Sequence, residues 1–221
     1  MPEPLSMRAF SRLAEDGVPI LDIRPLAAYR HSHVPGALSL PYSGSGFLAQ
    51  ARDLLPPGSR CLVLDDIPLL TAAAVSALAE AGAVVMGWLE GGTRAWAAAG
   101  HDTAAMAEWT PSRLAEEIGQ VELIDVREGW EVASGLIAGS RHIPLADLPH
   151  RVRELSADAT YVMVCRTGAR SSYAQSYLGR HRRRAINLEG GIVAWQEAGY
   201  QVVAPGSGEP EGSREEEGAE R

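Results

Sequence analysis

Short apolar runs alternate with longer stretches of helical periodicity along most of this chain. The apolar runs at 19–23, 61–64, 84–86, 121–126, 161–164 and 185–188 are expected to form strands. The stretches at 71–81 and 171–178 are expected to form helices, and Ser6 and Thr110 suit the N-caps of two more. Such alternation is typical of a parallel sheet covered by helices on both faces. It predicts an α/β fold, in which sites form at the carboxyl ends of the strands.

Four segments of the first half recur about 100 residues later in the same order. The pairs are LDIR at 21–24 with IDVR at 124–127, GALSLP at 36–41 with GSRHIP at 139–144, CLVL at 61–64 with YVMV at 161–164, and LEGGTRAWAAAG at 89–100 with LEGGIVAWQEAG at 188–199. The last pair shares eight of its twelve letters. Ordered matches at a nearly constant offset indicate a tandem duplication. We therefore expect one domain over 1–103 and a second over 108–204, each a parallel sheet flanked by helices.

The length of 221 residues suits two domains of about 100 residues each. No apolar run approaches the roughly 20 residues that a membrane helix needs, so no membrane partner is expected. The first ten residues carry neither a basic leader nor a long apolar segment, which predicts no secretory signal. Only Cys61 and Cys165 are present, at unlike local positions, so a disulfide framework is not expected. These features predict a cytoplasmic thiol protein.

All basic residues of the chain are arginines. The lack of lysine excludes a Schiff-base lysine, a pyridoxal phosphate anchor and the lysine of a phosphate-binding P-loop. The net charge is −8, and the stretch 205–221 contributes −4 of it through six glutamates and two arginines. We expect this acidic, Gly/Pro-rich tail to be disordered. Nucleic acid is not expected as a partner.

Cys165 follows the expected strand at 161–164 and precedes a short loop and a helix. The loop that we expect to bind substrate contains Arg166, Thr167, Gly168, Ala169, Arg170 and Ser171. Unpaired amides at a helix N-terminus and two arginines favour a negatively charged sulfur, and a glycine lets the backbone curve around an anion. We interpret Cys165 as a nucleophile beside a site for an anionic substrate. The alternative is a core cysteine followed by a solvated loop.

The loop sequence CRTGARS at 165–171 resembles the active-site loop of rhodaneses, the thiosulfate sulfurtransferases. The DVRE segment at 125–128 and LEGGIVAWQEAG at 188–199 are similar to other landmarks of that family. The resemblance covers nearly the whole chain, because the first half reads as a second, degraded copy. It implies two tandem rhodanese-like domains and a persulfide on Cys165. The sulfur would come from thiosulfate or another small anionic donor and pass to a thiol or a sulfur-carrier protein, with no metal or organic cofactor.

Two other enzyme classes use a similar cysteine loop. Cysteine phosphatases carry an arginine six positions after the cysteine, whereas here Ser171 has that position and Arg170 precedes it. The loop is one residue shorter, so its ring of amides would be cramped for phosphate. An arsenate reductase on the rhodanese scaffold keeps the short loop and stays open as an alternative. A non-catalytic binding module is the other alternative.

The first copy lacks the features that make the Cys165 loop reactive. Alignment of the strands places Asp65 opposite Cys165, so that DDIPLLT at 65–71 faces CRTGARS. Asp66 would repel an anion, and Pro68 removes an amide donor. Cys61 lies inside the expected strand, where it reads as a small buried apolar residue. We expect the first copy to be catalytically inactive and to cover one side of the active loop.

Other charged residues of the second copy carry weaker signals. Asp125 and Arg127 end a strand, and we interpret them as an ion pair that braces the loop, with direct substrate contact as the second possibility. Glu131 either joins that network or is a solvated carboxylate, and His142 reads as a hydrogen-bonded loop histidine. The basic run at 180–184 either attracts anions or forms a solvated face.

Overall fold

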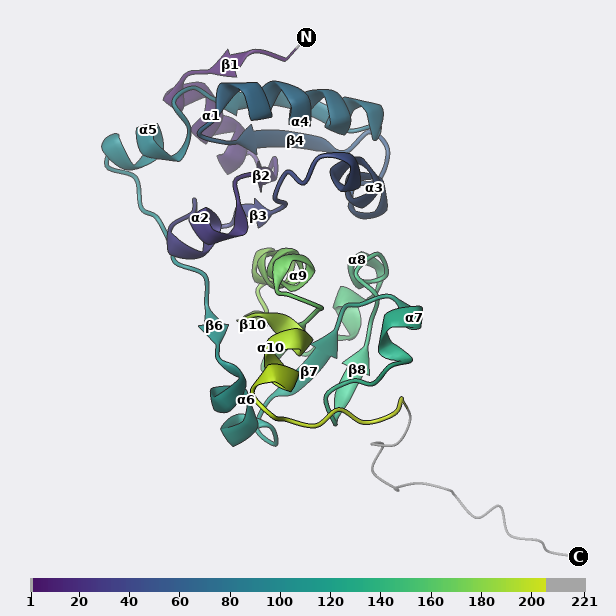
Figure 1. Ribbon diagram of the computed structural model, residues 1–221. Helices are drawn as coiled ribbons and strands as arrows, with labels where there is room; N and C mark the ends of the chain where they lie inside the picture. Colours follow the sequence, from purple (N-terminus) through teal and green to yellow (C-terminus); the bar gives the residue numbers. More distant parts are fainter. Residues whose placement is uncertain (1, 206–221) are drawn as a thin grey trace, which may run out of the picture.

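The computed structural model describes residues 2–205 and contains two five-stranded sheets in which every paired strand runs parallel (Figure 1). The strand orders are β1-β5-β4-β2-β3 and β6-β10-β9-β7-β8, which are the same order repeated. The α/β class and the tandem repeat predicted from the sequence are thus confirmed. The acidic tail expected at 205–221 lies, from residue 206 on, outside the described residues.

The first domain holds the elements β1 to α5. Their bounds are β1 (Pro4–Leu5), α1 (Met7–Glu15), β2 (Ile20–Asp22), α2 (Leu26–His31), β3 (Leu38–Ser39), α3 (Ser45–Leu54), β4 (Arg60–Leu64), α4 (Pro68–Glu80), β5 (Val84–Leu89) and α5 (Gly92–Ala98).

The second domain repeats this order. Its elements are β6 (Glu108–Trp109), α6 (Pro111–Glu117), β7 (Glu122–Asp125), α7 (Gly129–Val132), β8 (Ser140–His142), α8 (Leu148–Arg151), the 3-10 helix η1 (Val152–Glu154), β9 (Thr160–Val164), α9 (Ala169–Arg180), β10 (Arg184–Leu188) and α10 (Gly191–Glu197).

Local sequence signals explain where the helices begin. The side chain of Ser6 accepts a hydrogen bond from the amide of Ala9, and Thr110 does the same for Arg113, so both act as the expected N-caps. The helices α4 and α9 begin two to three residues before the bounds expected from periodicity, at Pro68 and Ala169. The short edge strands β1, β3, β6 and β8 have too few residues for a periodicity signal, so their positions come from the structure alone.

The central strands of both sheets are buried. β4 and β9 are each enclosed from their second residue to their last, which explains why they read as continuous apolar runs. Cys61 is fully buried in β4, and burial raises the pKa of its thiol to about 12. This agrees with the interpretation of Cys61 as a core residue.

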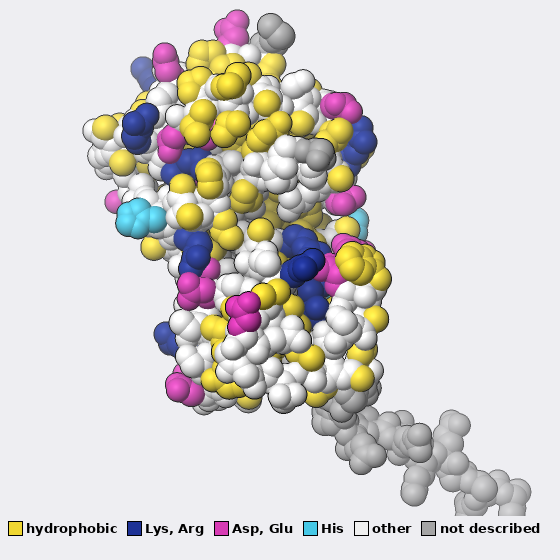
Figure 2. Space-filling view, viewed as in Figure 1, with side chains coloured by type: hydrophobic (Ala, Val, Ile, Leu, Met, Phe, Trp, Pro, Cys, Tyr) yellow, Lys and Arg dark blue, Asp and Glu magenta, His cyan; other side chains and the backbone are white. Residues whose placement is uncertain are grey.

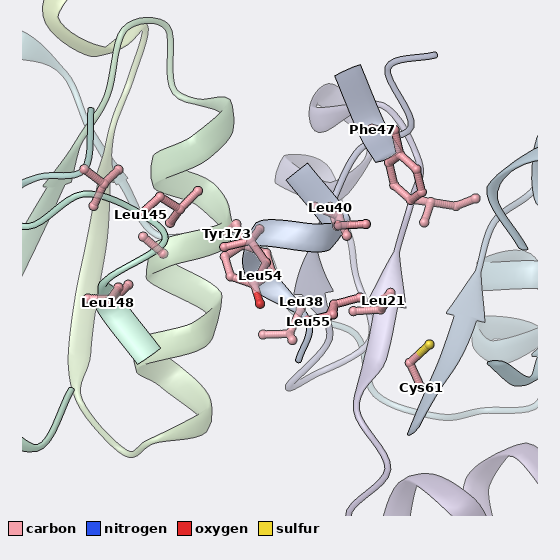
Figure 3. Close-up of a cluster of buried hydrophobic side chains, with 14 of the residues drawn as sticks. Leu21, Leu38, Leu40, Phe47, Leu54, Leu55, Cys61, Leu145, Leu148 and Tyr173 are labelled. Atoms are coloured by element: carbon pink, nitrogen blue, oxygen red, sulfur yellow. The ribbon is translucent and has the colours of Figure 1, made fainter. Parts of the chain in front are cut away.

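The two domains share one buried apolar cluster. Leu38, Leu54 and Leu55 of the first domain face Leu148 and Tyr173 of the second (Figure 3). Tyr173 lies on α9, the helix that follows the cysteine loop, so the first domain packs directly against the helix that carries the candidate site (Figure 1).

Polar contacts fix the same interface. The hydroxyl of Ser39, on the edge strand β3, lies 3.1 Å from that of Ser172, and the Ser39 amide donates to the Ser176 hydroxyl. Farther along, Arg30 pairs with Glu108 and, at 2.7 Å, with Glu189. Because buried polar groups are costly unless paired, the buried Ser39–Ser172 contact favours one relative position of the domains.

Candidate active site

Cys165 lies at the carboxyl end of β9, a central strand of the second sheet, as the sequence predicts. Its side chain is buried, with only 1% of the residue exposed. Two donors point at its sulfur: the amide of Gly168 at 3.1 Å and the hydroxyl of Ser171 at 3.2 Å. Both would favour a negative charge on Sγ, since each donates a hydrogen bond that strengthens as the sulfur gains charge.

The shape of the loop depends on glycine at two positions. Gly168 precedes α9 with φ of +101°, a left-handed conformation that turns its amide toward the sulfur. Gly191 also has a positive φ, and a Cβ there would overlap the carbonyl oxygen of Cys165. The amides of Ile192 and Val193 donate to the carbonyls of Cys165 and Arg166 at 2.9 and 3.2 Å. The second LEGG turn thus holds the cysteine loop in place through these backbone contacts. The repeated motif marked this turn in the sequence, but no role was predicted for it.

The two loop arginines differ in their surroundings. Arg170 is half-buried and donates to Glu131 from Nη1 at 2.5 Å and from Nη2 at 2.7 Å. The Arg170 hydrogen bonds lower the pKa of Glu131 to about 2. Arg166 is exposed and makes no ion pair within residues 2–205. Thr167 and Ala169 are exposed as well, so this side of the loop faces outward.

Asp125 and Arg127 form a buried ion pair, with Nη2 of the arginine 2.7 Å from Oδ2 of the carboxylate. Asp125 lies beside Val164 in the sheet, next to the cysteine. Arg127 also donates to the carbonyls of Gly135 and Glu131, at 2.8 and 3.4 Å. The pair therefore anchors the α7 segment that carries Glu131, and Glu131 in turn holds Arg170.

Glu131 thus belongs to the charged network. The alternative expectation, a solvated carboxylate, is wrong. His142 lies with its Nε2 2.8 Å from the carbonyl oxygen of Arg127, so it is hydrogen-bonded as expected, but it ends strand β8 and does not lie in a loop. No group of three or more His, Cys, Asp or Glu side chains within residues 2–205 is placed to hold a metal ion.

A cleft of about 320 Å³ lies between the domains beside Arg170. The first domain contributes residues from α3 and the preceding turn, and the second contributes Glu128, Leu145 and Arg170. In the space-filling view, basic side chains gather in the recess below the upper domain (Figure 2). The first domain therefore borders the space through which a ligand would approach this arginine.

The first copy repeats the scaffold without the thiol. Asp65 directly follows β4, and the Thr71 hydroxyl donates to its carboxylate at 3.2 Å, just as Ser171 donates to Cys165. Asp66 accepts from the Thr93 amide at 2.8 Å and pairs with Arg24 at 3.4 Å. The carboxylates of Asp65 and Asp66 thus accept the hydrogen bonds of the nearby donors in this loop.

The sequence matches the rhodanese-like domain family over residues 6–99 and again over 110–198. Together with the repeated parallel sheets and the cysteine at a strand end, this defines the chain as an α/β protein of tandem rhodanese-like domains. The chain belongs to the rhodanese-like family.

Two sequence relatives and one solved structure each match about one domain of the chain. A protein named sulfurtransferase from Allochromatium vinosum is 39% identical over 100 residues, which is 45% of this chain and 92% of its own length. A putative sulfurtransferase, YtwF of Bacillus subtilis, is 42% identical over 77 residues, covering 35% of this chain and 75% of the relative. The crystal structure of a rhodanese-related protein from Thermoplasma volcanium is 35% identical, with a TM-score of 0.43, over 44% of this chain and 97% of that one. The names of the two sequence relatives support a sulfurtransferase-type role at the level of the family.

The chain offers no helix in its described part that is long and apolar enough to cross a membrane.

Proposed function

We propose that this protein is a sulfurtransferase that moves a sulfane sulfur through a persulfide on Cys165. The single observation that carries the proposal is the environment of Sγ, which receives hydrogen bonds from the Gly168 amide and the Ser171 hydroxyl at the end of a central strand. A sulfur held by two donors in a buried cradle suits a thiolate and, after transfer, the charge of a persulfide.

The reaction has two steps, of which the first loads the enzyme. The Cys165 thiolate attacks the outer sulfur of thiosulfate or of a similar small anionic donor. A bond forms between the two sulfurs, the sulfur–sulfur bond of thiosulfate breaks, and sulfite leaves with the electron pair. The outer sulfur stays on Cys165 as a persulfide.

The second step unloads it. An acceptor thiolate, from a small thiol or a sulfur-carrier protein, attacks the outer sulfur of the persulfide. The bond to Sγ breaks, and its electron pair returns to Cys165 as a thiolate. No metal or organic cofactor takes part in either step as proposed.

The loop residues have distinct proposed roles. Arg166, which is exposed and makes no ion pair among the described residues, attracts the anionic donor at the mouth of the site. Thr167 and Ala169 form the exposed rim beside it. Arg170 contacts substrate from its position in the inter-domain cleft, with its direction set by Glu131. Asp125 and Arg127 brace this arrangement from below.

We also propose that the protein acts in the cytoplasm. Both cysteines are free thiols. A reducing compartment keeps such thiols available, and its pool of small thiols would supply acceptors.

Intact mass spectrometry tests the proposal most directly. Incubation with thiosulfate should add one sulfur, about 32 Da, and the addition should lie on the peptide that contains Cys165. Cyanide should then remove it and release thiocyanate. Parallel assays with p-nitrophenyl phosphate and with arsenate separate this activity from a phosphatase or an arsenate reductase. A protein that takes up no sulfur from thiosulfate, mercaptopyruvate or a small persulfide would disprove the proposal and favour a binding module.

A further inference from the structure

A second cavity of the described residues lies away from the cysteine loop. It has a volume of about 630 Å³ and lies between the domains, at the carboxyl-terminal half of α9 and the start of β10. None of its lining residues belongs to the loop at 165–171. The proposed sulfur chemistry therefore leaves this space unexplained, although its volume lies within the range of small-molecule sites.

Three arginines line the cavity, Arg180, Arg183 and Arg184, and no Asp or Glu side chain does. Arg180 donates to backbone carbonyls of the first domain, and the other two donate to the carbonyls of Leu155 and Asp158. Carbonyl oxygens accept hydrogen bonds but carry no net charge, and none of these three arginines forms an ion pair with a carboxylate of residues 2–205. These arginines belong to the basic run at 180–184, which was expected either to attract anions or to form a solvated face.

A buried side chain of the same cavity has an unmet hydrogen-bonding capacity. Gln175 is 9% exposed, and its amide nitrogen donates to the carbonyls of Ala107 and Ala185 at 3.1 and 3.2 Å. Because those carbonyls can only accept, the amide is oriented with its nitrogen toward them. The oxygen, Oε1, is buried and has no partner among residues 2–205. An unpaired buried acceptor costs about 1–3 kcal/mol and calls for a donor.

Another part of the wall is apolar. Ala37 of the first domain, Met106 of the connecting segment and Ile186 of β10 line the cavity. A ligand that fills the space would thus have three parts: an anionic group at the arginines, a hydrogen-bond donor toward Gln175 and a body that packs on the apolar wall.

We propose that this cavity binds a phosphate monoester with a hydroxyl-bearing organic body, of the size of a nucleotide or a sugar phosphate. Guanidinium groups match phosphate oxygens in pairs, and three of them suit a dianion better than a single carboxylate. A hydroxyl on the body donates to Gln175 Oε1. A free inorganic phosphate would meet the arginines, but it would leave both the acceptor and the apolar wall without a partner.

Binding here would connect the ligand to the arrangement of the domains. The wall includes Tyr29 and Ala37 from the first domain and Gln175, Arg180 and Arg184 from the second. A ligand that contacts both domains stabilises their observed arrangement, because it binds the folded, docked state and not the unfolded chain. The expected sign is a rise in the melting temperature with ligand concentration.

Calorimetric titration of the full chain with AMP and with glucose 6-phosphate tests the proposal and separates the two ligand bodies. Adenosine, glucose and inorganic phosphate are the control ligands. We expect saturable binding of at least one monoester, a higher melting temperature with it, and at least tenfold weaker binding of the control ligands. The proposal would be overturned if neither monoester binds, or if inorganic phosphate binds as tightly as the monoesters.

Two variants assign the binding to this cavity. Arg183→Gln combined with Arg184→Gln should lower the affinity for the monoester at least tenfold, because both positive charges are removed from the wall. Arg182→Gln is the matched control, since Arg182 is exposed and does not line the cavity. Unchanged affinity in the double variant, or equal loss in the control, would show that the ligand binds elsewhere. Sulfur uptake by Cys165, measured on the same samples, tests the other site independently.

Discussion

Arg170 and Glu131 face each other in a two-point ion pair, with the two guanidinium nitrogens 2.5 and 2.7 Å from the two carboxylate oxygens. The sequence places both Arg166 and Arg170 in the loop, and charge alone does not rank them. The ion pair with Glu131 ranks the two arginines, because it compensates the charge of Arg170 and leaves the charge of Arg166 open to an incoming anion.

Arg166→Ala should therefore raise the KM for thiosulfate about tenfold or more, since a hydrogen bond to a charged group contributes about 1.5–3 kcal/mol. Arg170→Ala should raise KM less, and it should also lower stability, because it leaves the carboxylate of Glu131 unpaired. Steady-state kinetics with thiosulfate and cyanide measure both effects. Arg153→Ala is the matched control, because Arg153 is exposed on η1 outside the loop. A larger KM effect in Arg170→Ala would contradict this ranking.

The same pair predicts a pH dependence of stability. The pKa of Glu131 is lowered to about 2 from an ordinary 4.5, first by the Arg170 hydrogen bonds. A carboxyl group whose pKa is depressed by folding contributes stability above its unfolded pKa and loses it as the pH falls through the folded value. We expect a loss of about 1–2 kcal/mol between pH 4.5 and pH 2, after allowance for the partial exposure of the pair.

Urea unfolding at a series of pH values measures this loss. Glu131→Gln should remove that part of the pH dependence, and it should be less stable than the parent protein at pH 7 by a similar amount. Parallel curves for parent and variant across this range would refute the assignment.

The two cysteines offer a direct test of the nucleophile. Cys165→Ser should abolish sulfur uptake while the protein stays folded, because a hydroxyl is a far weaker nucleophile than a thiolate at neutral pH. Cys61→Ser should retain turnover and lose about 1–3 kcal/mol, because its hydroxyl is buried in β4. Thiocyanate formation and circular dichroism decide the outcome. Sulfur transfer by the serine variant at position 165 would end the persulfide proposal.

Gly191 and its counterpart Gly92 provide a matched pair of backbone substitutions. Both have a φ of +61°, and a Cβ at either position would overlap the carbonyl oxygen at the end of the facing strand, that of Cys165 or of Asp65. Gly191→Ala and Gly92→Ala should each cost about 2–5 kcal/mol through left-handed strain and overpacking.

Only one of the two substitutions should alter chemistry. Gly191→Ala displaces the cysteine loop, so we expect at least a tenfold lower rate of iodoacetamide labelling or sulfur transfer per folded molecule. Gly92→Ala acts in the other domain and should leave that rate within twofold. Denaturant unfolding and activity are measured at a temperature where both variants are folded. Equal activity losses would show that Gly191 acts only through stability.

The elements that the sequence predicts are those with a local signal. Apolar runs gave the central strands, the caps at Ser6 and Thr110 gave two helix starts, and the offset of about 100 residues gave the duplication. Cys165 could be identified from the sequence because it directly follows a strand and is followed at once by an arginine-rich loop and a helix. The contacts that give the site its geometry span longer distances in sequence. Arg170 meets Glu131 across 39 residues, and Ser39 meets Ser172 across 133. Periodicity within a window of one element carries no information on such pairs.

The first copy should stay inactive even when it is given a cysteine. In the second copy the amide of Gly168 donates to Sγ, and the residue at the same place in the first copy is Pro68, which has no N–H. The carboxylate of Asp66 accepts from Thr93 and pairs with Arg24. A thiol at position 65 would therefore have a normal or raised pKa, about 8.5 or above, since a nearby carboxylate and burial both disfavour the thiolate.

We accordingly expect Asp65→Cys, built on a Cys165→Ser background, to bind no sulfur from thiosulfate by intact mass. Thiosulfate is itself a dianion and is repelled by Asp66. Replacing all of 65–71, DDIPLLT, by CRTGARS is the positive comparison on the same background. That graft restores the glycine amide and both arginines, and Gly92 still leaves room behind the loop. Sulfur uptake by the graft but not by the single variant would locate the defect in the loop. One bound sulfur in the single variant would show that the first cradle lacks only its thiol.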